Sequence, residues 1–407
     1  MAGARARFDL RAAARPVHRY VGLALALFLV LSGLTGSILV FQREVDQALN
    51  PHLWRVSADA PRLTPDQIAA RISAWDPRVQ ARWIPIEGHV APDVWVDPRI
   101  DPATGAPYPV GFNQVFVDPV SGEINGARAY GPFVLSTEAF IPWLDMFHRT
   151  LTIPGMWGTW LMGLVALVWA FDCFVGAYLT LPKGGPFWRK WAPAWGIKRG
   201  ASAARLTLDW HRAAGLWLWG VLLILAVSGV SFNLEHEVFE PVVSMVSPIA
   251  ENRFEHAPMD FANPRTPAFG FDAAIERARL AGGIPETASS SGLYYAPEIG
   301  GYGVAFGDAW AAGMGPTWVY IDGTTGALIE KVVPGQGNGG TVFAQAQLPL
   351  HSGRILGLPG RLIIFVAGIA TAMLSITGVA LWARRRIATL KAERRRRAYE
   401  ALPQAAE

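Results

Sequence analysis

Two similar stretches decide the fold, HRYVGLALALFLVLSGLTGSILV (residues 18–40) and HRAAGLWLWGVLLILAVSGVSFN (residues 211–233). Each opens with a His-Arg pair, places a glycine shortly after it, and continues as an uncharged apolar run. The two stretches align without a gap. A match of this kind between distant segments indicates that the chain is internally duplicated.

A second pair of segments repeats more loosely. LDMFH ends at His148 and LPLH ends at His351, and each leads through a Pro-Gly dipeptide into another apolar run. Each copy of the duplication therefore puts one histidine at each end of its apolar segments. We interpret the chain as an integral membrane α-helical protein, a duplicated four-transmembrane-helix bundle.

Composition supports membrane spans, because 51% of the 407 residues are hydrophobic and only 17% are charged. An apolar run needs about 20 residues to cross a bilayer core of roughly 30 Å. The uncharged first run is too long for a signal peptide and lacks a small-residue cleavage site, so we expect it to be retained. The predicted spans are residues 20–42, 156–181, 211–234 and 362–383.

Basic residues predict the orientation. More than half of the 36 Lys and Arg residues lie in segments 1–19, 182–210 and 384–407. Under the positive-inside rule these segments and both termini are cytoplasmic, and segments 43–155 and 235–361 lie outside. The excess of Lys and Arg residues thus indicates the membrane topology, and the partner that it implies is the lipid bilayer. No nucleic-acid-binding motif is visible.

The two outside segments are expected to form small α+β domains. Thr64 followed by Pro65 is typical of the start of a helix. Residues 282–316 are too rich in Gly and Ser to show periodicity, and the sequence does not decide whether they form a mobile lid or a disordered loop. The predicted elements are a helix from Thr64, a helix at Phe271–Ala278, and strands at Val79–Ile86, Pro92–Val96, Asn113–Val117 and Thr317–Ile321.

The four histidines predict haem. Two imidazoles above and below a haem saturate its iron for electron transfer. His18 and His211 lie at the cytoplasmic end of the duplicated spans, and His148 and His351 lie at the outer end. A span of about 22 residues rises roughly 33 Å, which leaves room for two stacked haems. The alternative is that these histidines are interfacial and reach into lipid headgroups, but their duplicated placement favours ligation.

The chain has a single cysteine, Cys173, inside a predicted span. Covalent c-type haem, Cys-based zinc sites and iron–sulfur clusters are therefore not expected. Glycines at equivalent positions in the repeat are expected to let a flat macrocycle approach the helices, or to allow close helix packing. These are Gly22, Gly36, Gly215 and Gly229.

Arginines near the histidines are placed to pair with haem propionates. For Arg19 and Arg212, flanking positive charge is an equal alternative. In the outer half, His236 is a possible alternative metal ligand or substrate contact, although its equivalent in the repeat is Arg43 and symmetry argues against it. The arginines are Arg19, Arg212, Arg149, Arg354 and Arg361.

Asp172 is the one acid inside a predicted span, which makes it a functional candidate. It is placed to accept a hydrogen bond from the far ring nitrogen of His18 or His211 and so to orient that ligand. A role in proton coupling or at a quinol site, and a functionless hydrogen bond within the helices, remain alternatives.

The His18-Arg-x-x-Gly22 opening, the exit FQREVD (residues 41–46) and the Asp-x-x-Ser/Thr-Gly turns at 118–122 and 322–326 resemble the PepSY-associated transmembrane family over roughly residues 14–384. The resemblance implies a multi-pass protein of the bacterial inner membrane with two extracytoplasmic PepSY-like domains and two haem b groups. It also implies reduction of a ferric siderophore in the periplasm to release Fe(II), with a cytoplasmic or quinol electron donor. No catalytic residue beyond the haem ligands is expected.

Two other functions are compatible with the sequence. The chain could be a membrane-anchored PepSY module that binds peptides or a protease without redox activity, and haem in the purified protein would exclude this. A permease is disfavoured because few polar residues lie inside the spans. Tryptophans of the outside segments are expected to form domain cores, and the alternative is a groove for a bulky chelate; they are Trp54, Trp83, Trp95, Trp310 and Trp318.

Overall fold

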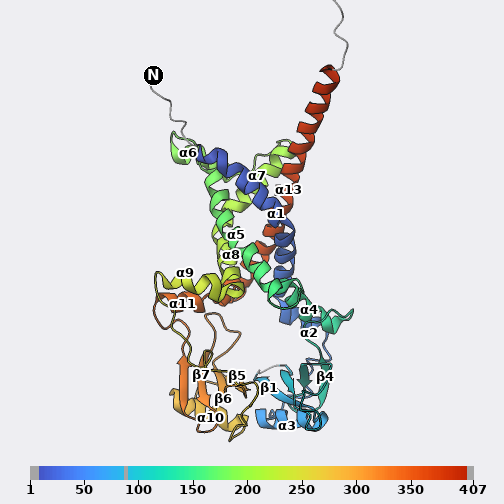
Figure 1. Ribbon diagram of the computed structural model, residues 1–407, viewed down its shortest axis with the longest axis vertical. Coiled ribbons are helices and arrows are strands. Elements are labelled where there is room, and N and C mark those ends of the chain that lie inside the picture. Colours follow the sequence, from blue (N-terminus) through green and yellow to red (C-terminus); the bar gives the residue numbers. More distant parts are fainter. Residues whose placement is uncertain (1–8, 87–89, 401–407) are drawn as a thin grey trace, which may run out of the picture. The chain divides into compact units, whose positions relative to one another are not determined.

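The computed structural model describes residues 9–86 and 90–400, so the first eight residues of the predicted cytoplasmic segment 1–19 lie outside it. The chain divides into two compact units (Figure 1). The helical unit comprises the chain up to Ser37, Gly155–Leu234 and the chain from Ile363. The sheet unit comprises Ile38–Pro154 and Glu235–Leu362.

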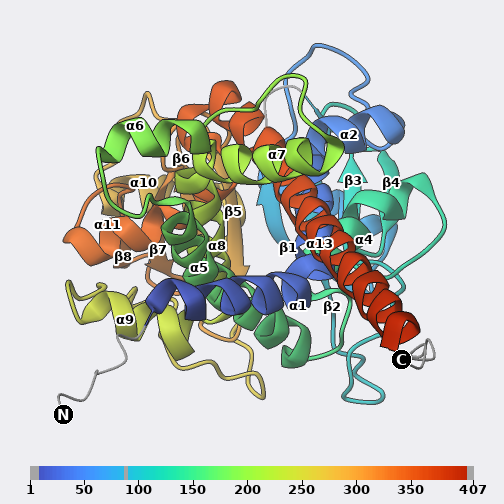
Figure 2. The same ribbon diagram turned by 90° about the horizontal axis from the view of Figure 1, so that it is seen from above.

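The helical unit contains most of each predicted membrane segment, and Figure 2 shows the long helices α1, α5 and α13. Helices α1, α5 and α13 are each long and apolar enough to cross a membrane, and α7 with α8 is a fourth candidate if this bent pair is one span. These helices support a helical membrane protein. The elements are α1 (Leu10–Leu39), α5 (Met156–Thr180), α6 (Phe187–Trp191), η1 (Ala192–Ala194), α7 (Ala203–Trp217), α8 (Trp219–Asn233) and α13 (Leu358–Glu400).

The third predicted span, residues 211–234, is broken. Helices α7 and α8 meet at an angle of 69°, around Leu218. The 15 residues of α8 rise roughly 22 Å, which is less than the bilayer core of about 30 Å. In α7, before the bend, Asp209 is fully buried and forms ion pairs with Arg205 and Arg212.

Small residues let the long helices approach each other. A Cβ on Gly33 of α1 would overlap the carbonyl oxygen of Gly368 in α13, and the Ser37 hydroxyl donates a 3.0 Å hydrogen bond to the Phe365 carbonyl. On the other pair of helices, a Cβ on Gly229 of α8 would lie 2.9 Å from the Ala166 side chain of α5. Gly229 therefore serves helix packing, and not the approach of a macrocycle.

The sheet unit is built on one antiparallel sheet of eight strands, in the order β4-β3-β2-β1-β5-β6-β7-β8. Its strands are β1 (Val79–Pro85), β2 (Asp93–Pro98), β3 (Gln114–Val117), β4 (Ile124–Arg128), β5 (Ser290–Ala296), β6 (Gly301–Phe306), β7 (Thr317–Asp322) and β8 (Leu328–Val332). Its helices are α2 (Gln42–Leu49), α3 (Pro65–Trp75), α4 (Thr137–Thr150), η2 (Glu235–Phe239), α9 (Glu240–Ser244), α10 (Phe271–Gly282), α11 (Gly339–Gln345), α12 (Gln347–His351) and η3 (Arg354–Leu356).

Segments 43–155 and 235–361 thus share a single sheet. Each supplies four strands, and β1 pairs antiparallel with β5 to join the two sets. We expected two small domains with sheets of their own, and sequence periodicity carried no information on this pairing. Joining the sets removes two exposed edge strands, which would otherwise invite pairing with other chains.

Strands β5 and β6 occupy part of the Gly- and Ser-rich region 282–316, so that part is neither a lid nor a loop. All six residues of β6 are buried, and a strand covered on both faces shows no alternation of polar and apolar residues. Helix α3 begins as predicted, because Thr64 and Gln67 form reciprocal hydrogen bonds in a capping box. Ile72 of α3 and Ala278 of α10 are fully buried in the core against the sheet.

A buried ion pair links helix α2 to strand β4. Arg128 donates two hydrogen bonds of 2.9 Å to the carboxylate of Asp46, and the two side chains are 6% and 3% exposed. We expect Arg128→Ala to lower the free energy of unfolding by about 3–5 kcal/mol, because Asp46 would keep a buried charge without its partner. Thermal unfolding of the detergent-solubilised chain measures this as a lower Tm.

The exposed pair of Arg253 and Glu330 gives the control. Its Arg253 side chain is 71% exposed, so Arg253→Ala should change the unfolding free energy by no more than about 1 kcal/mol. Equal Tm values for the two variants would show that burial of the Arg128 pair has no effect on stability.

Asp93 at the start of β2 makes the stability of the sheet unit depend on pH. Burial raises the pKa of Asp93 from its ordinary value of 3.8 to about 6. Between these two pH values, the carboxyl group of Asp93 keeps its proton in the folded chain and has lost it in the unfolded chain. The group therefore stabilises the fold most below about pH 4, and this contribution falls as pH rises to 6. As the pH rises from 4 to 7, we expect the free energy of unfolding of the Asp93→Asn variant to increase by up to about 3 kcal/mol relative to that of the wild type. The Tm values of the variant and the wild type, measured at both pH values, test this prediction. The same Tm difference between the two proteins at both pH values would contradict it.

Candidate functional site

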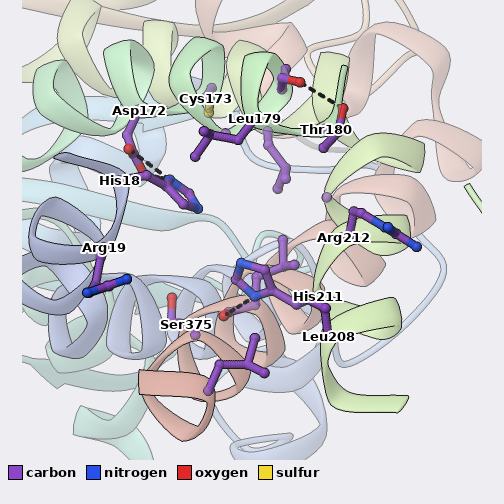
Figure 3. Close-up of a pocket in the computed structure, with 18 of the residues that line it drawn as sticks. His18, Arg19, Asp172, Cys173, Leu179, Thr180, Leu208, His211, Arg212 and Ser375 are labelled. Carbon is purple, nitrogen blue, oxygen red and sulfur yellow. Dashed lines mark hydrogen bonds and ion pairs between the residues drawn. The ribbon is translucent and has the colours of Figure 1, made fainter. Parts of the chain in front are cut away.

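His18 of α1 and His211 of α7 face each other in the helical unit. Their ring centroids are 6.2 Å apart and the ring planes are inclined by 58°. Both side chains line a cavity of about 410 Å³, and Figure 3 shows the two rings directed into the same space. A volume of this size suits a small-molecule ligand or cofactor.

The far nitrogen of each ring is held by a different kind of acceptor. His18 Nδ1 lies 2.9 Å from both carboxylate oxygens of Asp172, which is 8% exposed. His211 Nδ1 donates to the Leu374 carbonyl at 3.0 Å and lies 3.0 Å from the Thr377 hydroxyl. Because a carbonyl only accepts, Nδ1 of His211 carries the proton and Nε2 keeps its lone pair for a metal. The structure thus places Asp172 beside His18, as the sequence predicts.

Two glycines that sequence reasoning missed lie against the histidine rings. A Cβ on Gly176 of α5 would lie 3.2 Å from Cε1 of His18, and one on Gly378 of α13 would lie 3.3 Å from Cε1 of His211. Each glycine follows one helical turn after the residue that holds the ring, Asp172 or Leu374. No sequence signal pointed to this spacing, because the Leu374 contact is made by a backbone carbonyl. Gly22 lines the same cavity, and a Cβ there would meet open space.

The spacing of the rings fits a single metal ion between them. Two imidazole nitrogens bound on opposite sides of an ion at about 2.0–2.1 Å each place the ring centroids roughly 6 Å apart. Within residues 9–86 and 90–400, no group of three or more His, Cys, Asp or Glu side chains could hold a metal ion.

A second pair, His148 of α4 and His351 of α12, lies in the sheet unit. Its ring centroids are 6.4 Å apart and the planes are inclined by 64°. Burial, together with the nearby His148, lowers the pKa of His351 to about 3. His351 is therefore neutral at physiological pH, which is the form that binds a metal.

The backbone around this second pair is tightly constrained. Leu151 and Thr152, just after His148, have φ values of 54° and 56°, a left-handed conformation that non-glycine residues rarely adopt. After His351, Gly353 has φ 75° and packs directly on the backbone of Gly360. Strain of the kind seen at Leu151 and Thr152 is common at functional sites, whereas Gly353 adopts its conformation without strain.

The predicted arginines of the helical unit lie at the cavity. Arg19 and Arg212 both contribute to its lining. Arg212 donates to the Pro193 carbonyl at 2.7 Å and to Asp209 at 3.0 Å, and in Figure 3 its side chain points away from the two rings. Arg19 is exposed and also lines the cavity.

The predicted arginines of the sheet unit have other partners. Arg149 is 66% exposed and lies 3.6 Å from Asp145. Arg361 donates to the Val40 carbonyl and, at 2.8 Å, to Glu44. The Arg149 contact lies within helix α4, whereas the Arg361 contacts tie the start of α13 to the end of α1 and to α2.

His236 stands apart from the His148–His351 contact. Its side chain is 72% exposed and its Nδ1 lies 2.8 Å from Glu240 Oε2. The hydrogen bond and the charge of Glu240 raise the pKa of His236. The structure thus assigns it an exposed ion pair, and the two histidines that meet are His148 and His351.

Among curated proteins, none is significantly similar in sequence to the chain. A family model described as the PepSY-associated TM region matches residues 15–385, which include all four paired histidines. The chain therefore belongs to the PepSY-associated TM family.

Proposed function

We propose that the chain is a transmembrane reductase with two haem b groups that passes electrons from a cytoplasmic or quinol donor to a ferric siderophore on the other side of the membrane. The observation that carries this proposal is the pair of histidine contacts, with ring centroids 6.2 Å and 6.4 Å apart. Two such contacts in a chain with a duplicated sequence suit two cofactors of the same kind.

Haem, when bound, supplies an Fe(III)/Fe(II) couple that carries one electron at a time. The chain's own residues hold and orient it. His18 and His211 would hold one group, and His148 and His351 the other. A haem held by two imidazoles would serve for electron transfer, so the two histidine pairs suit a protein that passes electrons to an acceptor bound elsewhere.

Asp172 and Leu374 orient the first pair. A carboxylate that accepts the Nδ1 proton of His18 fixes the ring and makes its Nε2 a stronger donor. The Leu374 carbonyl does the same for His211 with no negative charge. Apolar side chains from α5, α8 and α13, together with several arginines, line the cavity into which the two rings point.

The overall reaction on the substrate is the addition of one electron to the chelated iron. Fe(III) becomes Fe(II), and no bond to carbon or hydrogen forms or breaks. Hard oxygen donors hold Fe(III) more tightly than Fe(II), so the reduced ion leaves the chelate. We place the chain in the bacterial inner membrane with both termini cytoplasmic, on the basis of its basic segments.

Sealed proteoliposomes test the proposal. A reductant is trapped inside, and a ferric siderophore with an Fe(II)-specific dye is added outside. We expect Fe(II) to form outside only in vesicles that contain the haem-loaded chain. Accumulation of chelate inside would indicate a permease, and protein without haem or reduction would indicate a PepSY binding module.

A further inference from the structure

A short helix of the helical unit exposes aromatic and basic side chains together. Helix α6 (Phe187–Trp191) and the turn η1 after it connect α5 to α7. The side chain of Trp188 is 74% exposed, and Phe187 and Trp195 are exposed as well. Neighbouring exposed apolar side chains mark a surface that meets a membrane or another molecule. We refer to residues 187–195 as the α6–η1 segment.

Helix α6 has an aromatic side and a basic side. The ring centroids of Phe187 and Trp191 are 5.4 Å apart, and those of Trp188 and Trp191 are 5.7 Å apart. Successive helical residues are about 100° apart around the axis, so these three rings share one side of α6. Arg189 and Lys190 then occupy the opposite side. This pattern is typical of a helix that lies in the headgroup region of a membrane.

Contacts with α5 and α7 hold the α6–η1 segment at one end of a membrane span. Nε1 of Trp191 donates a 3.1 Å hydrogen bond to the hydroxyl of Thr180, the last residue of α5. The carbonyl of Pro193 accepts a 2.7 Å hydrogen bond from Arg212 of α7. Because α5 is long and apolar enough to cross a membrane, its end lies where the hydrocarbon core gives way to headgroups. Figure 1 shows α6 at the end of the helical unit where α1 begins.

The connection that contains α6 has basic residues and no acidic ones. Six Lys and Arg residues lie between Asp172 and Asp209, and no Asp or Glu does. Two of these six have acidic neighbours, because Arg205 pairs with Asp209 and the charge of Lys183 acts on Asp9. Basic residues next to a membrane span attract anionic lipid headgroups.

The two basic residues of α6 itself are accessible to a ligand at the surface. The side chains of Arg189 and Lys190 are both exposed. In the part of the chain that the structure describes, neither forms an ion pair with an acidic side chain. Their charge is therefore available to an anionic group outside the chain.

We propose that the α6–η1 segment binds anionic phospholipid headgroups in the leaflet at the C-terminal end of α5. Its aromatic side chains lie at the boundary between headgroups and acyl chains, as interfacial tryptophans do, and Arg189 and Lys190 pair with the negative headgroups. Thr180 and Arg212, which contact the segment, also line the cavity of the first histidine pair. Bound lipid would thus restrain the two helices beside that cavity. The proposal depends neither on haem nor on electron transfer.

A second copy of the chain is the other occupant that an aromatic surface of this kind could have. Two copies that met symmetrically through the segment would bring the same basic residues, Arg189 and Lys190, close to each other. Like charges at a contact repel, whereas an anionic headgroup neutralises them. The charge of the segment therefore favours the lipid.

The experiment is fluorescence quenching in proteoliposomes of phosphatidylcholine and phosphatidylglycerol, with bromine on the acyl chains of one lipid or of the other. The signal of Trp188 is the difference between the wild type and Trp188→Phe. We expect brominated phosphatidylglycerol to quench Trp188 about twofold to fivefold more strongly than brominated phosphatidylcholine at the same mole fraction. Replacing both basic residues, Arg189→Gln with Lys190→Gln, should make the two lipids quench equally.

Two controls match these variants. Trp157 is exposed at the opposite end of α5, in a stretch without Lys or Arg, so its signal, obtained from Trp157→Phe, should be quenched equally by both lipids. The double variant Arg394→Gln with Arg395→Gln removes the same charge from exposed positions on α13. It should leave the preference at Trp188 unchanged. Circular dichroism of each variant in the same liposomes checks that the helices are retained.

Absence of quenching at Trp188 with either lipid would overturn the proposal, because the segment would then lie off the membrane. Equal quenching of the wild type by the two lipids would also overturn it and leave an aromatic anchor without lipid selectivity. Quenching that is lost as the protein-to-lipid ratio rises would identify a second copy as the occupant. Loss of the preference in the α13 double variant would assign it to the net charge of the chain and not to α6.

Discussion

The His351→Ala variant should carry one haem where the wild type carries two, and it should reduce ferric chelates at the background rate. The ring of His351 lies 6.4 Å from that of His148, and a haem held by this pair would lose one of the two residues that hold it. The His18–His211 pair lies in the other unit of the chain and should keep its low-spin spectrum. Haem quantification and the proteoliposome assay measure the two effects.

His236→Ala is the matched control. Its side chain is exposed and paired with Glu240, so both haems and the reduction rate should remain. Wild-type reduction by the His351→Ala variant would show that His351 takes no part in the electron path. Loss of haem from the His236→Ala variant would show that His236 is the ligand.

Replacing Asp172 with asparagine should raise the midpoint potential of the haem at His18 and His211. The asparagine carbonyl can still accept the Nδ1 proton of His18, so the ring keeps its orientation. The negative charge that stabilises the ferric state is lost, however, and ligand basicity falls. Loss of such a supporting group also typically weakens metal binding by about tenfold to a hundredfold. A redox titration followed at the haem absorption bands measures the midpoint potential. The amount of haem retained after dilution measures how strongly the haem is bound.

The matched control for Asp172→Asn is Thr377→Val. His211 Nδ1 would keep the Leu374 carbonyl, at 3.0 Å, as its acceptor, so potential and haem retention should change little. Equal potentials in the wild type and the Asp172→Asn variant would mean that the contact between Asp172 and His18 does not tune the site.

The histidine contacts could be predicted from sequence because they follow from duplication. A gapless match placed His18 opposite His211, and a looser one placed His148 opposite His351. Asp172 could be predicted too, because an acid inside an apolar span needs a polar partner. Each of these inferences used a residue type that is rare in its surroundings, and such residues carry the most information in a membrane sequence.

Other features depend on tertiary packing and gave no such signal. The acceptor for His211 is the backbone carbonyl of Leu374, and any residue type could supply it. The junction of β1 with β5 pairs strands from separate segments, and a strand buried on both faces, such as β6, has no alternating pattern. The bend between α7 and α8 lies within aromatic and apolar residues that would suit a straight helix equally well.

The most direct test of the account is a visible spectrum of the detergent-purified chain, oxidised and reduced, with haem quantified per chain after haem-replete expression. The account predicts two haem b groups per chain with low-spin spectra, as expected for iron held between paired imidazoles. A chain that binds no haem would contradict the central claim and leave the four histidines as structural residues.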